Sequence, residues 1–302
     1  FDANPTCPED YGGRAEGTCP LSRPPNLAVS PLDPQELFVA GNWRNAFSAD
    51  GGRTWEERVR GADITCVTDL RFLDGKTYVT SMDEGLAVSE DDGANWRQLL
   101  PLRYDTAISG HNWRVAVQSS GATQRILTTC SPWAEPPNRV FVSEDGGRTF
   151  RMGRAGLPDY RPTPNTMWGE SYPRALAVDP RDPQVLYLGM DGDPEPAKGR
   201  AGGGLFKSTD GGYTWTQLPN QPGSRRCFNA LAVDPTDPNG LYWGACGAGG
   251  GLYRSDDAGQ TWKHVFRSES WVFNVAVSPT GVVYCPGTNL WSSTDRGATW
   301  NK

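Results

Sequence analysis

The stretch Ser255-Asp-Asp-Ala-Gly-Gln-Thr-Trp262 decides the fold, because close variants of it occur five more times in the chain. The shared pattern is Ser-x-Asp-x-Gly-x-Thr-Trp, with Asn95 replacing the Thr once and Phe150 replacing the Trp once. The other copies run Ser48–Trp55, Ser89–Trp96, Ser143–Phe150, Ser208–Trp215 and Ser293–Trp300.

Each copy is typical of a hairpin turn between two strands. Ser and Asp side chains bond backbone N–H groups a few residues further on, and Gly accepts a left-handed backbone. Thr and Trp suit the strand that follows. A repeated carboxylate could also bind a metal or act in catalysis, but we interpret these aspartates as structural turn residues. They are Asp50, Asp91, Asp145, Asp210, Asp257 and Asp295.

The pattern is that of the Asp-box, or BNR repeat, so the chain resembles the Asp-box β-propeller superfamily. That superfamily includes sialidases, xyloglucanase-type glycosidases, sortilin-type receptors and photosystem II assembly-factor-like proteins. The resemblance implies an all-β propeller of four-stranded antiparallel blades with the boxes at the turns between the third and fourth strands. It leaves the function open, because one fold serves many functions.

A second repeated phrase lies upstream of the boxes, as in Ala230-Leu-Ala-Val-Asp-Pro-Thr-Asp-Pro238. An apolar run, a Pro-rich turn and another apolar run predict two antiparallel strands. We therefore predict six blades, with a seventh possible. Their expected bounds are 27–62, 63–106, 107–170, 171–223, 224–268 and 269–302, after an N-terminal extension at 1–26.

Composition narrows the class of partner. The net charge is −6 and no long basic run occurs, which argues against nucleic acid as a partner. No apolar stretch is long enough to span a bilayer. No cofactor or metal is predicted, since the chain has only two histidines. Met190-Asp-Gly-Asp-Pro-Glu195 could hold Ca²⁺, but a solvated acidic loop is the preferred interpretation.

The chain has seven cysteines, and whether they form disulfides indicates the cellular compartment of the protein. We predict disulfides between Cys7 and Cys19 and between Cys227 and Cys246, which would place the protein outside the cytoplasm, secreted, periplasmic or at the cell surface. The alternative for each pair is buried reduced thiols.

The loops opposite the boxes carry the candidate site, because propellers usually bind ligands there. Aromatic rings beside carboxylates and guanidinium groups suit either a glycan or a protein interface. The candidate ligand-binding residues are Trp43, Arg44, Trp113, Trp133, Trp168, Tyr172, Arg174, Arg226 and Trp271.

Two functions remain open at this point. The first is a non-catalytic propeller outside the cytoplasm that binds a protein partner or serves as a scaffold, and this is the one we expect. The second is a glycoside hydrolase or carbohydrate-binding propeller, with Glu170 and Asp191 as the carboxyl pair that hydrolysis requires. Sialidase chemistry is not expected, because that family's early Arg-containing motif has no match in context.

Overall fold

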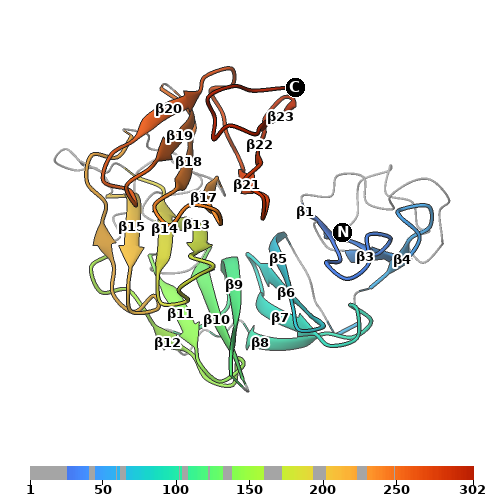
Figure 1. Cartoon of the computed structure of the whole chain (residues 1–302). Helices are drawn as coiled ribbons and strands as arrows, with labels where there is room; N and C mark the ends of the chain where they lie inside the picture. The colour runs from blue at the N-terminus through green and yellow to red at the C-terminus, as the bar shows by residue number, and fades with distance from the viewer. Residues whose placement is uncertain are drawn as a thin grey trace. The chain divides into compact units, whose positions relative to one another are not determined.

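A computed structural model describes residues 26–40, 45–58, 60–61, 66–101, 103, 108–121, 123–131, 138–159, 172–192, 202–222, 230–247 and 249–302. These residues form six antiparallel sheets and contain no helix (Figure 1). The fold is an all-β propeller of six blades, which confirms the predicted class. The chain divides into two compact units, Phe1–Thr128 with Ser143–Arg151 and Thr129–Val142 with Met152–Lys302.

Unit 1 contains blades 1 and 2, in each of which the strands pair in chain order. Blade 1 consists of β1 (Asn26–Val29), β2 (Leu37–Ala40), β3 (Asn45–Ser48) and β4 (Glu56–Glu57). Blade 2 consists of β5 (Val67–Leu73), β6 (Lys76–Ser81), β7 (Gly85–Ser89) and β8 (Arg97–Pro101). Blade 3 is shared by the two units and consists of β9 (Asn112–Ser120), β10 (Thr123–Cys130), β11 (Val140–Ser143) and β12 (Arg151–Met152).

Unit 2 contains blades 4, 5 and 6. Blade 4 consists of β13 (Pro173–Val178), β14 (Leu186–Met190), β15 (Gly204–Ser208) and β16 (Thr216–Gln217). Blade 5 consists of β17 (Leu231–Val233), β18 (Leu241–Ala245), β19 (Gly251–Ser255) and β20 (Lys263–Phe266). Blade 6 has three strands instead of the four predicted, β21 (Ala276–Val277), β22 (Val283–Pro286) and β23 (Leu290–Ser293). A single bridge between Ser292 and Asn301 stands where the fourth strand would pair.

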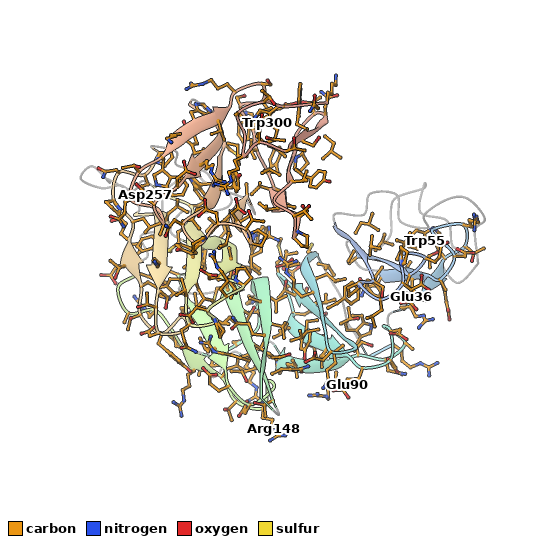
Figure 2. The ribbon with its side chains drawn as sticks, viewed as in Figure 1. Glu36, Trp55, Glu90, Arg148, Asp257 and Trp300 are labelled. Carbon is orange, nitrogen blue, oxygen red and sulfur yellow. The ribbon has the colours of Figure 1, made fainter. Side chains whose placement is uncertain are left out.

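The box turns are held by their own side chains, and Asp257, in the turn between β19 and β20, is an example (Figure 2). Ser255 Oγ donates to Asp257 Oδ1 at 2.7 Å and accepts from the Gly259 amide at 2.8 Å. Asp257 Oδ1 and Oδ2 accept from the Thr261 amide and hydroxyl at 2.8 and 2.6 Å. Gly259 has a φ of 92°, and a Cβ there would lie 2.7 Å from Leu218 Cδ1. Only glycine therefore fits both the backbone and the packing.

The core consists of apolar side chains packed between successive blades. In five blades the second strand carries an aromatic residue at an equivalent position. We identify that position by the residue with which it pairs on the third strand. In blades 1, 4 and 5 the cross-strand pairs from second to third strand are Phe38–Phe47, Tyr187–Lys207 and Tyr242–Arg254. Tyr78 and Tyr284 occupy the same position in blades 2 and 6.

The rings of blades 1 and 4 face the next blade along the chain. Tyr187 packs with Leu231, Leu241 and Trp243 of blade 5, and Phe38 packs with Val67 and Val79 of blade 2. Burial of such rings is the main source of stability in a sheet-on-sheet core. Tyr284 of blade 6 is not buried in this way, because its side chain is 39% exposed.

Candidate functional site

Three predicted site residues meet at the start of blade 4. Tyr172 precedes β13, Arg174 lies in it, and Asp191 directly follows β14. Antiparallel pairing of β13 with β14 brings these ends together, and the Asp191 amide donates to the Tyr172 carbonyl at 3.1 Å. Arg174 Nε lies 3.0 Å from Asp191 Oδ2 and donates to the Tyr172 hydroxyl.

This cluster is buried and charged. Arg174 and Asp191 are both 6% exposed, and the guanidinium lies 4.9 Å from the centre of the Tyr172 ring. A buried carboxylate requires such a partner, because an unpaired charge in this environment is strongly unfavourable. The cluster therefore fixes the position of the Asp191 carboxylate. Glu170, its predicted catalytic partner, lies outside the described residues.

Two exposed aromatic rings lie at the start of blade 6. Trp271 is 42% exposed and Phe273 is 48% exposed, and their ring centroids are 6.0 Å apart with planes inclined by 26°. Val272 between them is fully buried, so both rings lie on the side of the chain opposite to Val272. Trp271 also forms an antiparallel bridge with Cys246, which holds this segment beside blade 5. The two rings together form an apolar platform that is open to solvent.

Glu269 stands two residues before Trp271 and is fixed by the hairpin between β22 and β23. Its Oε2 accepts from Thr288 Oγ1 at 3.0 Å and its Oε1 accepts from Trp291 Nε1 at 3.3 Å. Desolvation opposes ionisation, but hydrogen bonds from Thr288 and then Trp291 outweigh it and lower the pKa of Glu269 below its usual 4.5. A Cβ at Gly287 would lie 2.8 Å from the Glu269 carboxyl carbon, so the hairpin needs glycine there. Glu269 is thus an ionised acceptor two residues before Trp271.

The remaining predicted residues divide into two groups. Trp113 lies in β9 of unit 1, half-buried, with the Arg114 guanidinium 5.7 Å from its ring centre. The Cys246 thiol is buried and lies 3.4 Å from the Val272 carbonyl. Outside the described residues lie Trp43, Arg44, Trp133, Trp168, Arg226, Cys7, Cys19 and Cys227. The two disulfides therefore stay predictions.

Sequence reasoning did not single out Phe273 as a site residue. The alternation Trp271-Val-Phe273 ahead of the Ala-Val-Ser-Pro phrase was the available signal. Local sequence does not encode the exposure of Phe273, which the structure gives as 48%.

Comparisons with known proteins agree with this architecture. The BNR/Asp-box repeat model matches residues 253–264. The crystal structure of the GH74 xyloglucanase from Xanthomonas campestris is similar, with a TM-score of 0.61 and 23% identity over 90% of this chain and 45% of that one. The chain is an Asp-box β-propeller. YCF48 bound to D1 peptide has the same fold, with a TM-score of 0.60 and 16% identity over 91% of this propeller and 79% of that chain.

Two proteins with a sequence similar to this chain are named as xyloglucanases. A xyloglucanase from a Paenibacillus species is 42% identical over 142 residues, which is 45% of this chain and 10% of that protein. A xyloglucanase from Hypocrea jecorina is 37% identical over 215 residues, which is 67% of this chain and 22% of that protein. The propeller thus spans less than a quarter of either relative.

These relatives correct one expectation. The sequence analysis favoured a non-catalytic scaffold that binds a protein partner, and that prediction is wrong. The similarity to two xyloglucanases favours a glycoside hydrolase or carbohydrate-related propeller instead. No helix within the described residues is long and apolar enough to cross a membrane.

Proposed function

We propose that this Asp-box propeller is part of a glycoside hydrolase that binds and cleaves xyloglucan-type polysaccharide outside the cytoplasm. The observation that carries the proposal is the exposed Trp271–Phe273 platform, with the ionised Glu269 two residues before it in the chain. The names of the curated relatives supply the class of substrate. A location outside the cytoplasm follows from that substrate, since a large polysaccharide does not cross a membrane intact.

The platform has the chemistry that a sugar chain needs. A pyranose ring has an apolar face of C–H groups, which stacks on an aromatic ring, while its equatorial hydroxyls donate hydrogen bonds. Glu269, held ionised by Thr288 and Trp291, can accept from such hydroxyls, and charge-assisted bonds of this kind are the stronger ones. Trp271 and Phe273 would thus each contact the apolar face of one of two successive sugar units of an extended glycan.

Cleavage requires two carboxyl groups, one on each side of the scissile bond. We propose Asp191 as one of them and Glu170 as the other. Tyr172 and Arg174 would act as positioning residues, because both contact Asp191 or its guanidinium partner. Further contacts to the glycan are proposed for Trp43, Arg44, Trp113, Trp133, Trp168 and Arg226.

Binding is tested by calorimetric titration with xyloglucan heptasaccharide. Trp271→Ala should weaken binding about tenfold, since loss of one stacked ring costs roughly 1 to 1.5 kcal/mol and 1.4 kcal/mol is tenfold. Leu32→Ala removes an apolar side chain that is 87% exposed in unit 1 and should leave glycan binding unchanged. Equal affinity of Trp271→Ala and wild type would show that the platform does not bind the glycan.

Cleavage is tested by following reducing ends released from xyloglucan. Glu170→Gln and Asp191→Asn should each lower the rate by at least about a hundredfold, as expected for loss of a general acid or base, while the glycan still binds. Full activity in both variants would reject this carboxyl pair and leave the binding platform standing.

A further inference from the structure

A cavity of about 340 Å³ opens in unit 1 between the first loops of blades 1 and 2. These loops join β1 to β2 and β5 to β6, so the cavity lies at the same strand ends as the box turns. Its apolar lining includes Phe38, Phe47, Phe72, Leu32 and Leu37, of which Leu32 is the most exposed. All five are apolar, and none of them belongs to the glycan platform described above.

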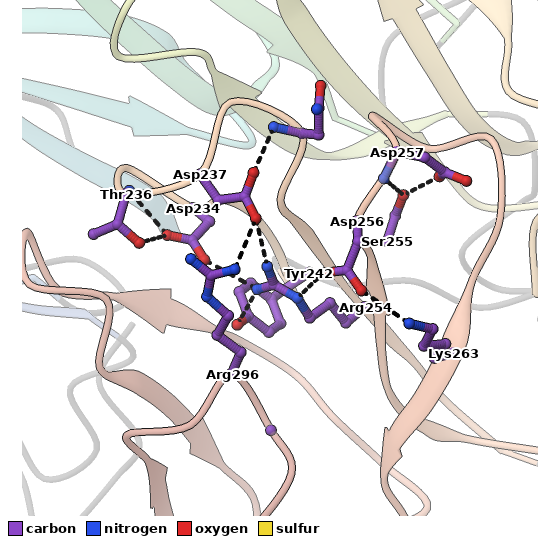
Figure 3. A network of polar contacts seen from close by, with 12 residues as sticks. Asp234, Thr236, Asp237, Tyr242, Arg254, Ser255, Asp256, Asp257, Lys263 and Arg296 are labelled. Carbon is purple, nitrogen blue, oxygen red and sulfur yellow. Dashed lines mark hydrogen bonds and ion pairs between the residues drawn. The ribbon is translucent and has the colours of Figure 1, made fainter.

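We call this place in a blade, beside the first loop and the pair of second and third strands, the slot. In blade 5 the slot contains different side chains (Figure 3). There Tyr242 pairs with Arg254, whose side chain is only 3% exposed and lies 4.8 Å from the centre of the Tyr242 ring. The guanidinium contacts Asp234 at 3.0 Å and Asp237 at 3.1 Å. A third contact joins it to Asp256 at 2.5 Å. A cluster of ion pairs, called the charged plug below, therefore takes the place of apolar side chains here, although Asp237, Arg254 and Asp256 also line a cavity of about 630 Å³.

Blade 4 fills its slot with polar groups as well. Lys207 Nζ lies 5.4 Å from the centre of the Tyr187 ring, and Arg181 Nε lies 2.8 Å from Asp179 Oδ1. In blades 4 and 5 the loop and the cross-strand pair thus both contribute ionic side chains. The polar plug is a recurring feature of the fold in these two blades.

Register makes the three blades directly comparable. Val29 pairs with Leu37, Val178 with Leu186 and Val233 with Leu241, and the connecting loops have equal length. Ser30 therefore stands where blade 5 has Asp234, Leu32 where it has Thr236, and Phe47 where it has Arg254. Blade 1 thus has a small or apolar residue in place of Asp234 and Arg254 but keeps an aspartate, Asp33, in place of Asp237, and the cavity lies at this slot.

Two features of the cavity point to a ligand. Leu32 lines the cavity and is 87% exposed, and it would be covered by any ligand that entered. Burial of such a side chain is favourable by roughly 1.5 to 3 kcal/mol. The volume is at the lower end of the range for small-molecule sites, roughly 300–1,000 Å³, and suits one large side chain.

The rim of the cavity is acidic. Glu36, Asp74 and Asp92 line it. Lys76 also lines the cavity and is paired with Glu90 at 2.7 Å, and Arg58, which lies 4.7 Å from the centre of the Phe47 ring, is paired with Glu56 at 2.9 Å. The surplus charge is thus negative and favours a cationic ligand.

We propose that this cavity binds a peptide that inserts one large apolar or aromatic side chain and places a Lys or Arg on the acidic rim. A sugar does not suit it, because hydroxyl groups would lose water without gaining partners on the phenylalanine walls. The peptide site is additional to the glycan platform and does not depend on it.

The test uses the whole chain and the peptide Ac-Lys-Phe-Lys-amide, followed by shifts of the Leu32 and Phe72 backbone amides in NMR titrations. We expect saturable shifts at these amides. Ac-Lys-Ala-Lys-amide should bind at least about tenfold more weakly, and Ac-Glu-Phe-Glu-amide about three- to tenfold more weakly. Equal binding of all three peptides would overturn the proposal, and so would tighter binding of phenethylamine than of the Lys-Phe-Lys peptide.

A variant that rebuilds the plug provides the sharpest control. The double substitution Ser30→Asp with Phe47→Arg places blade 5 chemistry in blade 1 and should abolish binding while the chain stays folded. Leu27→Ala, which removes an exposed leucine of the same blade outside the cavity, should leave binding unchanged. If the plug variant keeps its far-UV spectrum and thermal transition but still binds the peptide, the cavity is not the site.

Discussion

Trp215 is the box aromatic of blade 4 and is 3% exposed. Its indole Nε1 donates to the Gly153 carbonyl at 3.2 Å, and its amide donates to the Ala155 carbonyl at 2.8 Å. The side chain therefore joins its own turn to the end of blade 3 within unit 2. Trp215→Ala should lower the free energy of unfolding by roughly 3 to 5 kcal/mol, the usual cost of deleting a large buried aromatic.

Urea denaturation followed by far-UV circular dichroism measures this loss. Trp271→Ala is the matched control, since it deletes the same side chain from a position that is 42% exposed. We expect the control to change stability by less than about 1 kcal/mol. A similar loss in both variants would mean that burial does not govern the contribution of these residues.

Blade 5 offers a test at the scale of a structural element. Arg254 lies in β19 and is the shared partner of Asp234 and Asp237, and Asp234 is fully buried. Arg254→Met keeps most of the side-chain volume but leaves the buried carboxylate without its cation. We expect a loss of about 3 to 5 kcal/mol in the free energy of unfolding, because breaking a buried ion pair strands a charge.

Arg181→Met in blade 4 is the comparison, since Arg181 pairs with one aspartate and its side chain is 33% exposed. For this variant we expect the free energy of unfolding to fall by less than about 1 kcal/mol, as is usual for surface ion pairs. Chemical denaturation of both variants under one set of conditions distinguishes the plug from an ordinary surface pair. An equal, small loss in both would show that solvent screens Arg254 despite its burial.

Local signals predicted most of the blade architecture. The box spacing located the turns, and the Ala-Val-Asp-Pro phrase located the first two strands, because both depend on residues close together in sequence. The three-stranded blade 6 was not predicted. Its Tyr284 has the same register position as Tyr242 but is 39% exposed, whereas Tyr242 is buried, and local sequence does not encode this difference. For the same reason the candidate site was predicted for Trp271 but not for Phe273.

The six boxes together govern how the whole molecule responds to acid. Hydrogen bonds from Thr54 hold the pKa of Asp50 at about 2, and those from Thr261 and Thr299 do the same for Asp257 and Asp295. For Asp145 and Asp210 burial opposes the shift, but bonds from Thr149 and Thr214 outweigh it and the pKa is again about 2. The pKa of Asp91 is also lowered, chiefly by Asn95.

An aspartate whose folded pKa lies below its ordinary 3.8 contributes stability above that value and loses the contribution as pH falls towards 2. The five box aspartates with a pKa of about 2 should together take up roughly four protons when the protein unfolds near pH 3. We therefore expect the melting temperature to be nearly flat from pH 7 to 5 and to fall steeply from pH 4 to 2. Calorimetric scans across this range measure the slope. Asp295→Asn should reduce the proton uptake by roughly one, and a slope unchanged in that variant would show that the boxes do not set the acid limit of the fold.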